Sequence, residues 1–120
     1  MKIFQALRPV ILGLILIIST LGSSSADTQK GVNAYLEGDY ATALKELMPF
    51  AEQGDIQSQG LFCSMYLNGR GTPKNYVEAL KWCQLAANQG DDVSQYFLGL
   101  IFRTGKGVSK NYVEALKWYR

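Results

Sequence analysis

Apolar side chains recur at steps of three and four residues over most of the chain, which is the pattern of amphipathic helices. The clearest apolar face lies on residues 76–89 and consists of Tyr76, Ala79, Leu80, Cys83, Ala86 and Ala87. Short stretches rich in Gly, Asn and Asp separate such segments and are typical of turns. We predict helices over 28–36, 40–53, 56–67, 76–89, 92–103 and from residue 112 onward. The pattern therefore predicts an all-α chain.

A nine-residue sequence, KNYVEALKW, occurs twice without change, at residues 74–82 and 110–118. The offset of 36 residues lies in the range that is typical of stacked repeat proteins. Each unit would be one helix-turn-helix pair that buries its apolar faces against its neighbours. We predict three units, 27–55, 56–91 and 92–120, which form an α/α solenoid.

The predicted helix ends carry residues that commonly begin or close a helix. Asn75 is followed three residues later by Glu78, the spacing of a side-chain N-cap and an acid that returns to the cap. Asn111 and Glu114 repeat this pair in the next unit. Gly54 is placed to adopt the left-handed conformation that closes a helix. These signals support the predicted boundaries.

Small residues occupy equivalent places in the predicted hairpins. They are Gly31, Cys63 and Gly99 in the first helices and Ala43, Ala79 and Ala115 in the second helices. Small side chains at a crossing allow two antiparallel helices to approach closely. Units two and three have a connection four residues longer than unit one, and this extra length holds a Gly-x-Gly loop.

Cys63 and Cys83 are the two cysteines of the chain, one on each predicted helix of unit two. Both fall on inward faces, so a disulfide between the helices is one hypothesis. Such a bridge would stabilise the fold by about 3 kcal/mol. The other hypothesis is a pair of buried thiols in the places that Gly99 and Tyr119 occupy in unit three. The sequence leaves both open.

The first 26 residues have the pattern of a secretory signal peptide. Lys2 and Arg8 precede an apolar core over residues 10–18, and small residues follow up to Ala26. The apolar run is shorter than the roughly 20 residues that span a bilayer. We predict cleavage after Ala26 and a periplasmic or secreted protein without a membrane association; an uncleaved anchor is the alternative.

Composition excludes several classes of function. The formal charge is +2, and Lys2 and Arg8 account for it, so the chain from Asp27 onward is neutral. A neutral balance gives no footprint for nucleic acid or for an anionic membrane surface. The chain has no His, the commonest general base and metal ligand. We expect no cofactor, no metal and no catalytic residues.

The Gly-x-Gly loops at 69–71 and 105–107 lack the strand and the Ser or Thr of a phosphate-binding loop, so we interpret their glycines as turn residues. Tyr76, Trp82, Tyr112 and Trp118 repeat with the same period as the units. Aromatic stripes can bind sugars or peptides, but at helical spacing inside a repeat they favour core and inter-unit packing.

The segments 95–102, 105–108 and 112–119 closely resemble the Sel-one-like repeat (SLR) family, a relative of the tetratricopeptide repeat with a longer interhelical loop. Unit one, with its shorter connection, is more similar to the tetratricopeptide form. The resemblance implies a right-handed superhelix, an interaction scaffold and, as in many bacterial members, export. Unit three stops at Arg120, before the Ala-Ala segment and closing Gly of the family. Either the chain is part of a longer protein, or its end is covered. The cover would be a partner protein, or a second copy of the chain in a homo-oligomer.

The tetratricopeptide relationship implies that the first helices line a concave surface that binds a protein or peptide. By helical phase, the residues on that surface are Val32, Tyr35, Gly60, Ser64, Leu67, Tyr96, Leu100 and Arg103. Our leading hypothesis is a non-enzymatic interaction module. The alternative is an envelope hydrolase of the β-lactamase type, suggested by some cysteine-rich family members, although no Ser here has a Lys three residues later.

Overall fold

The structure is a computed structural model that describes residues 27–119, so the predicted signal peptide and its cleavage site lie outside the described residues. Residues 27–36 are helical and precede five further helices. These are α2 (Tyr40–Glu52), α3 (Ile56–Asn68), α4 (Tyr76–Asn88), α5 (Asp92–Thr104) and α6 (Tyr112–Trp118). No strand occurs in this part of the chain, and the predicted helix boundaries are confirmed to within about one residue.

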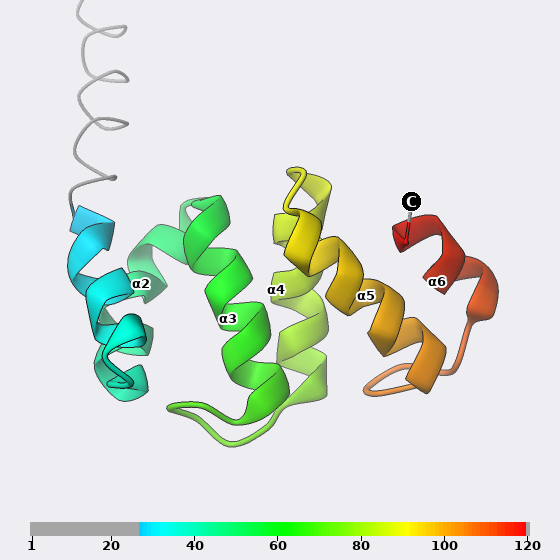
Figure 1. Cartoon of the computed structure of the whole chain (residues 1–120), viewed down its shortest axis with the longest axis horizontal. Helices are drawn as coiled ribbons and strands as arrows, with labels where there is room; N and C mark the ends of the chain where they lie inside the picture. Colours follow the sequence, from blue (N-terminus) through cyan, green and yellow to red (C-terminus); the bar gives the residue numbers. More distant parts are fainter. Residues whose placement is uncertain (1–26, 120) are drawn as a thin grey trace, which may run out of the picture.

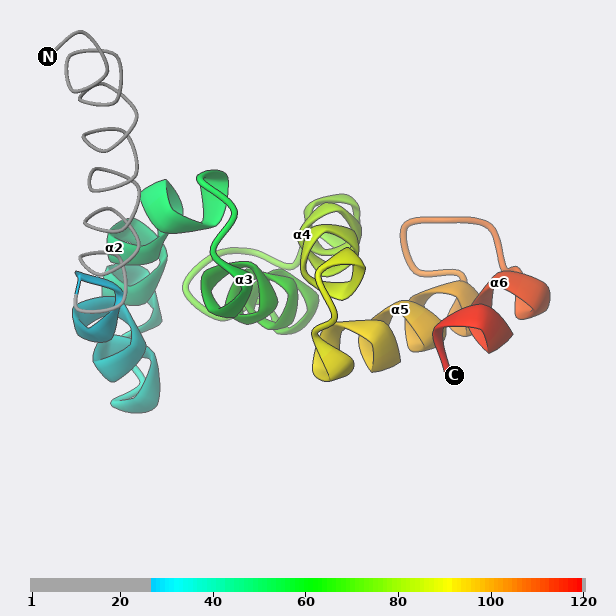
Figure 2. The ribbon, with the colours of Figure 1, turned by 90° about the horizontal axis from the view of Figure 1, so that it is seen from above.

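Successive helices run up and down and follow one another along the long axis of the molecule (Figure 1). Each helix from α2 to α5 packs on the next, and α3 also contacts α5, the first helix of the following unit. Seen from above, the units form one row (Figure 2). The loops between α3 and α4 and between α5 and α6 lie at one edge, and the turns between units lie at the other (Figure 1). The prediction of an all-α solenoid is confirmed.

Side-chain caps begin the second helices, as predicted. The Asn75 side chain accepts a hydrogen bond from the Glu78 amide at 3.1 Å, and Asn111 accepts one from Glu114 at 3.0 Å. The reciprocal half of the predicted cap is wrong, because the Asn75 amide donates to the Tyr66 carbonyl at 3.0 Å. The equivalent bond from the Asn111 amide to the Phe102 carbonyl measures 2.8 Å. These bonds tie each long loop back to the helix that precedes it.

The core runs through all three units as a line of buried apolar side chains. Its members are Ala34, Ala43, Leu47, Ala51, Phe62, Cys63, Met65, Ala79, Trp82, Cys83, Ala86, Ala87, Leu98, Ile101 and Ala115. Four of the six residues predicted for the apolar face of α4 are among them, and Tyr76 and Leu80 are half-buried. The Trp82 ring meets Phe62 edge to face, with 5.3 Å between ring centroids, which confirms its predicted core role.

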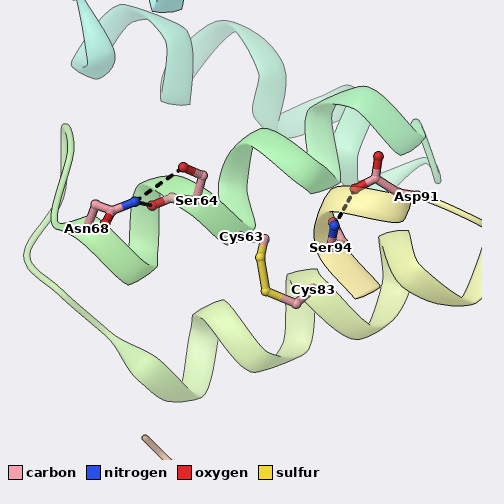
Figure 3. The surroundings of a disulfide bond; sticks show 6 residues. All are labelled: Cys63, Ser64, Asn68, Cys83, Asp91 and Ser94. Carbon is pink, nitrogen blue, oxygen red and sulfur yellow. Dashed lines mark hydrogen bonds between the residues drawn. A yellow bond between two sulfur atoms is a disulfide. The ribbon is translucent and has the colours of Figure 1, made fainter. Parts of the chain in front are cut away.

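In each unit the two helices cross at one pair of residues, and these pairs occupy equivalent positions in the three units. In unit two, Cys63 and Cys83 are joined by a disulfide with 4.8 Å between their Cα atoms (Figure 3). In unit three the equivalent residues are Gly99 and Tyr119, and a Cβ added to Gly99 would collide with the tyrosine ring. In unit one, a Cβ added to Gly31 would collide with Leu47. The equivalent crossing is therefore held by a disulfide in unit two, by glycine against tyrosine in unit three, and by glycine against leucine in unit one.

Candidate functional site

The long loops join neighbouring units. The Arg70 guanidinium lies 5.4 Å from the centroid of the Tyr40 ring, and the Lys106 ammonium lies 5.6 Å from that of Tyr76. The following glycine approaches the same tyrosine so closely that a Cβ on Gly107 would lie 2.8 Å from the Tyr76 Cβ. Contacts between a cation and the face of an aromatic ring are attractive. These loops therefore dock on the preceding unit, and their four glycines have positive φ, as their interpretation as turn residues predicted.

Of the eight residues predicted on the first-helix surface, none is fully buried. Tyr96 and Arg103 are exposed, and the others are half-buried: Val32, Tyr35, Gly60, Ser64, Leu67 and Leu100. Three of the eight, Leu67, Leu100 and Arg103, line a common cavity of about 330 Å³ between α3 and α5. We call it the α3–α5 cavity. Its lining consists of Leu67, Asn68, Phe97, Leu100, Ile101, Arg103, Thr104 and Lys106.

The other predicted residues lie elsewhere or serve packing. The Tyr35 hydroxyl accepts a hydrogen bond from Arg70 Nη1 at 3.3 Å and so belongs to the contact between units one and two. Gly60 faces the start of α5, where an added Cβ would lie 3.3 Å from Asp91 Oδ2. Tyr96 lines a separate cavity of about 340 Å³ beside α6. The predicted surface is therefore not one continuous groove.

Five residues of the α3–α5 cavity were missed by the sequence reasoning: Asn68, Phe97, Ile101, Thr104 and Lys106. A signal was present for two of them, because the 36-residue period pairs Asn68 with Thr104 as it pairs Leu67 with Arg103. The prediction from helical phase included only the residues along one stripe of each helix. It therefore omitted residues that lie beside that stripe. Lys106 was considered only as part of its loop.

The cavity combines an apolar floor with a polar rim. Leu67, Phe97 and Leu100 are half-buried, and Ile101 is 1% exposed. On the rim, the Asn68 side-chain amide donates to the Ser64 carbonyl at 2.9 Å (Figure 3). The Thr104 hydroxyl donates to the Leu100 carbonyl at 2.7 Å. These bonds hold both side chains against their own helices and leave the apolar floor accessible.

A larger cleft of about 540 Å³ lies between the end of α2 and α4, on the second-helix side, and was not predicted. Its amide groups are already engaged. The Gln59 side-chain NH₂ group donates to the Ala51 carbonyl at 3.0 Å, and Gln89 donates to Gln59 at 2.7 Å and to the Gly54 carbonyl at 3.1 Å. Because this network binds unit one to unit two, we interpret the cleft as an inter-unit junction.

Within the described residues, no group of three or more His, Cys, Asp or Glu side chains is arranged to hold a metal ion. In the same part of the chain, none of the helices combines the length and the apolar character that a bilayer span requires.

Comparison with known proteins agrees with the geometry. The family model for the Sel1 repeat matches residues 60–91 and 92–120, just over half of the chain. A solved Sel1 repeat protein from Oxalobacter formigenes is 38% identical, with a TM-score of 0.74, and the match covers 78% of this chain and 39% of that one. The protein c5321, a protective antigen of uropathogenic Escherichia coli with an SLR fold, is 33% identical over 84% of this chain and 22% of that one, with a TM-score of 0.75.

The chain thus spans well under half the length of either solved protein. No curated protein matches it. Sel1 repeat proteins are generally scaffolds for interactions between proteins, in which stacked helix pairs present their surfaces to partners. The repeated 36-residue period, the stacked helix pairs and the matched family model all lead to one conclusion: the chain belongs to the Sel1 repeat family.

Proposed function

We propose that the protein is an exported, non-enzymatic scaffold that binds a peptide or a partner segment in the α3–α5 cavity. The observation that carries this proposal is the convergence of Leu67, Leu100 and Arg103, from two different units, on one cavity. Apolar pockets with a few polar groups at the rim hold individual side chains of an extended segment.

Two features support export. The first 26 residues have the composition of a signal peptide, although they lie outside the described residues. Cys63 and Cys83 are bonded to each other, and structural disulfides persist in oxidising compartments such as the periplasm. A protein of that location would meet its partner outside the cytoplasm.

The composition supports a role without catalysis. The chain has no His, and both cysteines are used in the disulfide, so neither is available as a nucleophile. No structural observation favours the hydrolase alternative over binding. Turnover of a chromogenic β-lactam by the purified protein would contradict the non-enzymatic role.

The face of α6 is a second candidate contact surface. It exposes Tyr112, Val113, Leu116 and Tyr119. In units one and two the residues equivalent to Tyr112, Tyr40 and Tyr76, lie under a loop cation of the following unit. We include in the proposal that a further helix hairpin or a second copy of the chain covers this face. Sedimentation of the purified protein tests the second copy, and a strict monomer at 0.1 mM would exclude it.

Binding in the cavity is tested by replacing one floor residue. Peptides selected from a display library against the wild-type protein should bind a Leu100→Ser variant at least about tenfold more weakly, because the variant loses an apolar contact. Val93→Ser is the matched control, since Val93 is an exposed apolar residue on the same helix outside the cavity. Equal weakening by both variants, or by neither, would contradict this site.

A further inference from the structure

The two long loops of the molecule are basic. The loop edge carries Arg70, Lys74, Lys106 and Lys110, and residues 69–75 and 105–111 contain no Asp or Glu. At the opposite edge, Asp55 and Asp91 cap the helices that begin there. Acids are present at the same edge as the loops, with Asp39 at the start of α2 and Glu78 and Glu114 in the first turns of α4 and α6, but they lie outside the two loops and the cavity lining.

The α3–α5 cavity opens beside the basic loop 105–111, which contributes Lys106 to its lining. Arg103 and Lys106 are two of its eight lining residues, and none of the eight is acidic. Helix α3 contains no charged residue at all. Asp92, the acid of α5, stands at the first residue of that helix, whereas Arg103 stands in its last turn. No carboxylate among the residues that line the cavity therefore competes for its cations.

Arg103 is the free cation of this pair. Its side chain is exposed, and among the described residues it makes no hydrogen bond, ion pair or ring contact. A guanidinium group presents five donors in a planar fork that matches a carboxylate. Lys106 is held over the Tyr76 ring at 5.6 Å, which orders its ammonium group near the rim. The cavity thus offers two cations beside an apolar floor.

We propose that the occupant of the α3–α5 cavity is an acidic extended segment of a partner protein, in which an apolar side chain stands between Asp or Glu side chains. The apolar side chain would lie on the floor formed by Leu67, Phe97 and Leu100, and the carboxylates would meet Arg103 and Lys106. Two separate cations favour two side-chain carboxylates over the single carboxylate of a chain terminus. This inference rests on the proposed function and names the class of its ligand.

Three short fluorescent peptides test it by polarisation. The first is a capped Ser-Glu-Leu-Glu-Ser peptide, and the second is its capped Ser-Gln-Leu-Gln-Ser counterpart. The third, Ser-Gln-Leu, ends in a free carboxylate. We expect the Glu peptide to bind about tenfold more tightly than the Gln peptide, from two partly exposed ion pairs of up to about fivefold each. Added salt should reduce this preference. Tighter binding of the third peptide than of the first would overturn the assignment to side-chain carboxylates.

A double-mutant cycle locates the effect at Arg103. Arg103→Gln should weaken the Glu peptide about fivefold and leave the Gln peptide unchanged. Lys45→Gln is the control, because it removes an equal charge from an exposed position on α2 and should change neither peptide. Circular dichroism verifies that both variants fold.

The outcomes separate this inference from the proposed function. If the Glu and Gln peptides bind equally and Leu100→Ser weakens both, the cavity binds peptides without a preference for acids, and only this inference fails. If neither these peptides nor display-selected ones respond to Leu100→Ser, the proposed function fails as well. Equal weakening of both peptides by Arg103→Gln would assign Arg103 a packing role and would also overturn the inference.

Discussion

Units two and three share an identical run of nine residues, yet they pack their helix crossings differently. Unit two joins Cys63 to Cys83 by a covalent bond, whereas unit three places Gly99 under the ring of Tyr119. Cys83 is completely buried, while Tyr119 is 42% exposed. The comparison indicates that the repeated segment determines where helices begin and cross, and that the residues outside it determine how firmly each crossing is held.

Replacing the two crossing residues of unit two with those of unit three should have the largest effect on the free energy of unfolding. A Cys63→Gly, Cys83→Tyr variant loses the disulfide, about 3 kcal/mol for a loop of this length. It also forces a large ring into a site with no free surface, which costs about 1–3 kcal/mol more. We expect the free energy of unfolding, measured by denaturant titration, to fall by roughly 4–6 kcal/mol. Cys63→Ala, Cys83→Ala is the control for the lost bond, and equal stability of the two variants would contradict the difference between the sites.

The reverse exchange should strengthen unit three. Gly99 and Tyr119 are equivalent by the 36-residue period to Cys63 and Cys83, so a Gly99→Cys, Tyr119→Cys variant is expected to form a disulfide. The bridge would hold α6 on α5 and stabilise the unit by about 2 kcal/mol, at the low end of typical values. A thiol assay and hydrogen exchange of the α6 amides measure the result. Two reactive thiols in the oxidised protein would show that the two crossings differ in geometry.

The two identical caps should respond differently to the same substitution. Asn75→Ala and Asn111→Ala each remove a side-chain cap, at a cost of about 1 kcal/mol. Helix α4 has 13 residues and is packed on both sides, so the first loss should appear in global unfolding. Helix α6 has 7 residues, so the second loss should increase local exchange of its amides instead. An equal fall in global stability for both variants would show that α6 unfolds together with the rest.

The smallest effect concerns Tyr66, whose equivalent in unit three is Phe102. Burial, assisted by the Glu78 carboxylate, raises the pKa of the Tyr66 hydroxyl above its ordinary value of 10.0. The folded protein therefore holds this proton more firmly than the unfolded chain does. The resulting stability is present below pH 10 and is lost as the pH rises through the folded pKa.

Tyr66→Phe tests this by giving unit two the side chain of unit three. Between pH 9 and pH 12, the free energy of unfolding should decline less steeply for the variant than for the wild-type protein. Denaturant titrations at each pH measure both slopes. Identical slopes would mean that the environment of the Tyr66 hydroxyl does not change on unfolding.

The sequence predicted most of the fold because its signals are local. Asn75, Asn111 and Gly54 determine helix ends through their own side chains or backbone freedom, and the structure has these ends where they were expected. The reciprocal part of the cap prediction was wrong because the actual contact is not local: the Asn75 amide donates to the Tyr66 carbonyl, nine residues earlier. Likewise, spacing alone allowed either a disulfide or two thiols for Cys63 and Cys83.

The candidate site was predicted only in part, for a related reason. Helical phase assigned Leu67, Leu100 and Arg103 to the outward faces of their helices, but it does not state which of those faces meet around one cavity. The close approach of α3 to the start of α5 uses Gly60 for packing, and Tyr96 lies beside Tyr119 in a separate cavity. Such offsets between units depend on contacts that only the assembled repeat contains.

The cation of each long loop has a consequence for the order in which the protein forms. Arg70 of unit two completes the packing around Tyr40 of unit one, and Lys106 of unit three does the same for Tyr76 of unit two. The packing of units one and two is therefore completed in each case by the unit that follows. The chain leaves the ribosome with its N-terminus first. A hairpin therefore lacks its cation–ring contact until the loop of the next unit has been synthesised. A pause in synthesis should therefore leave the most recent unit more open to proteases than the units before it.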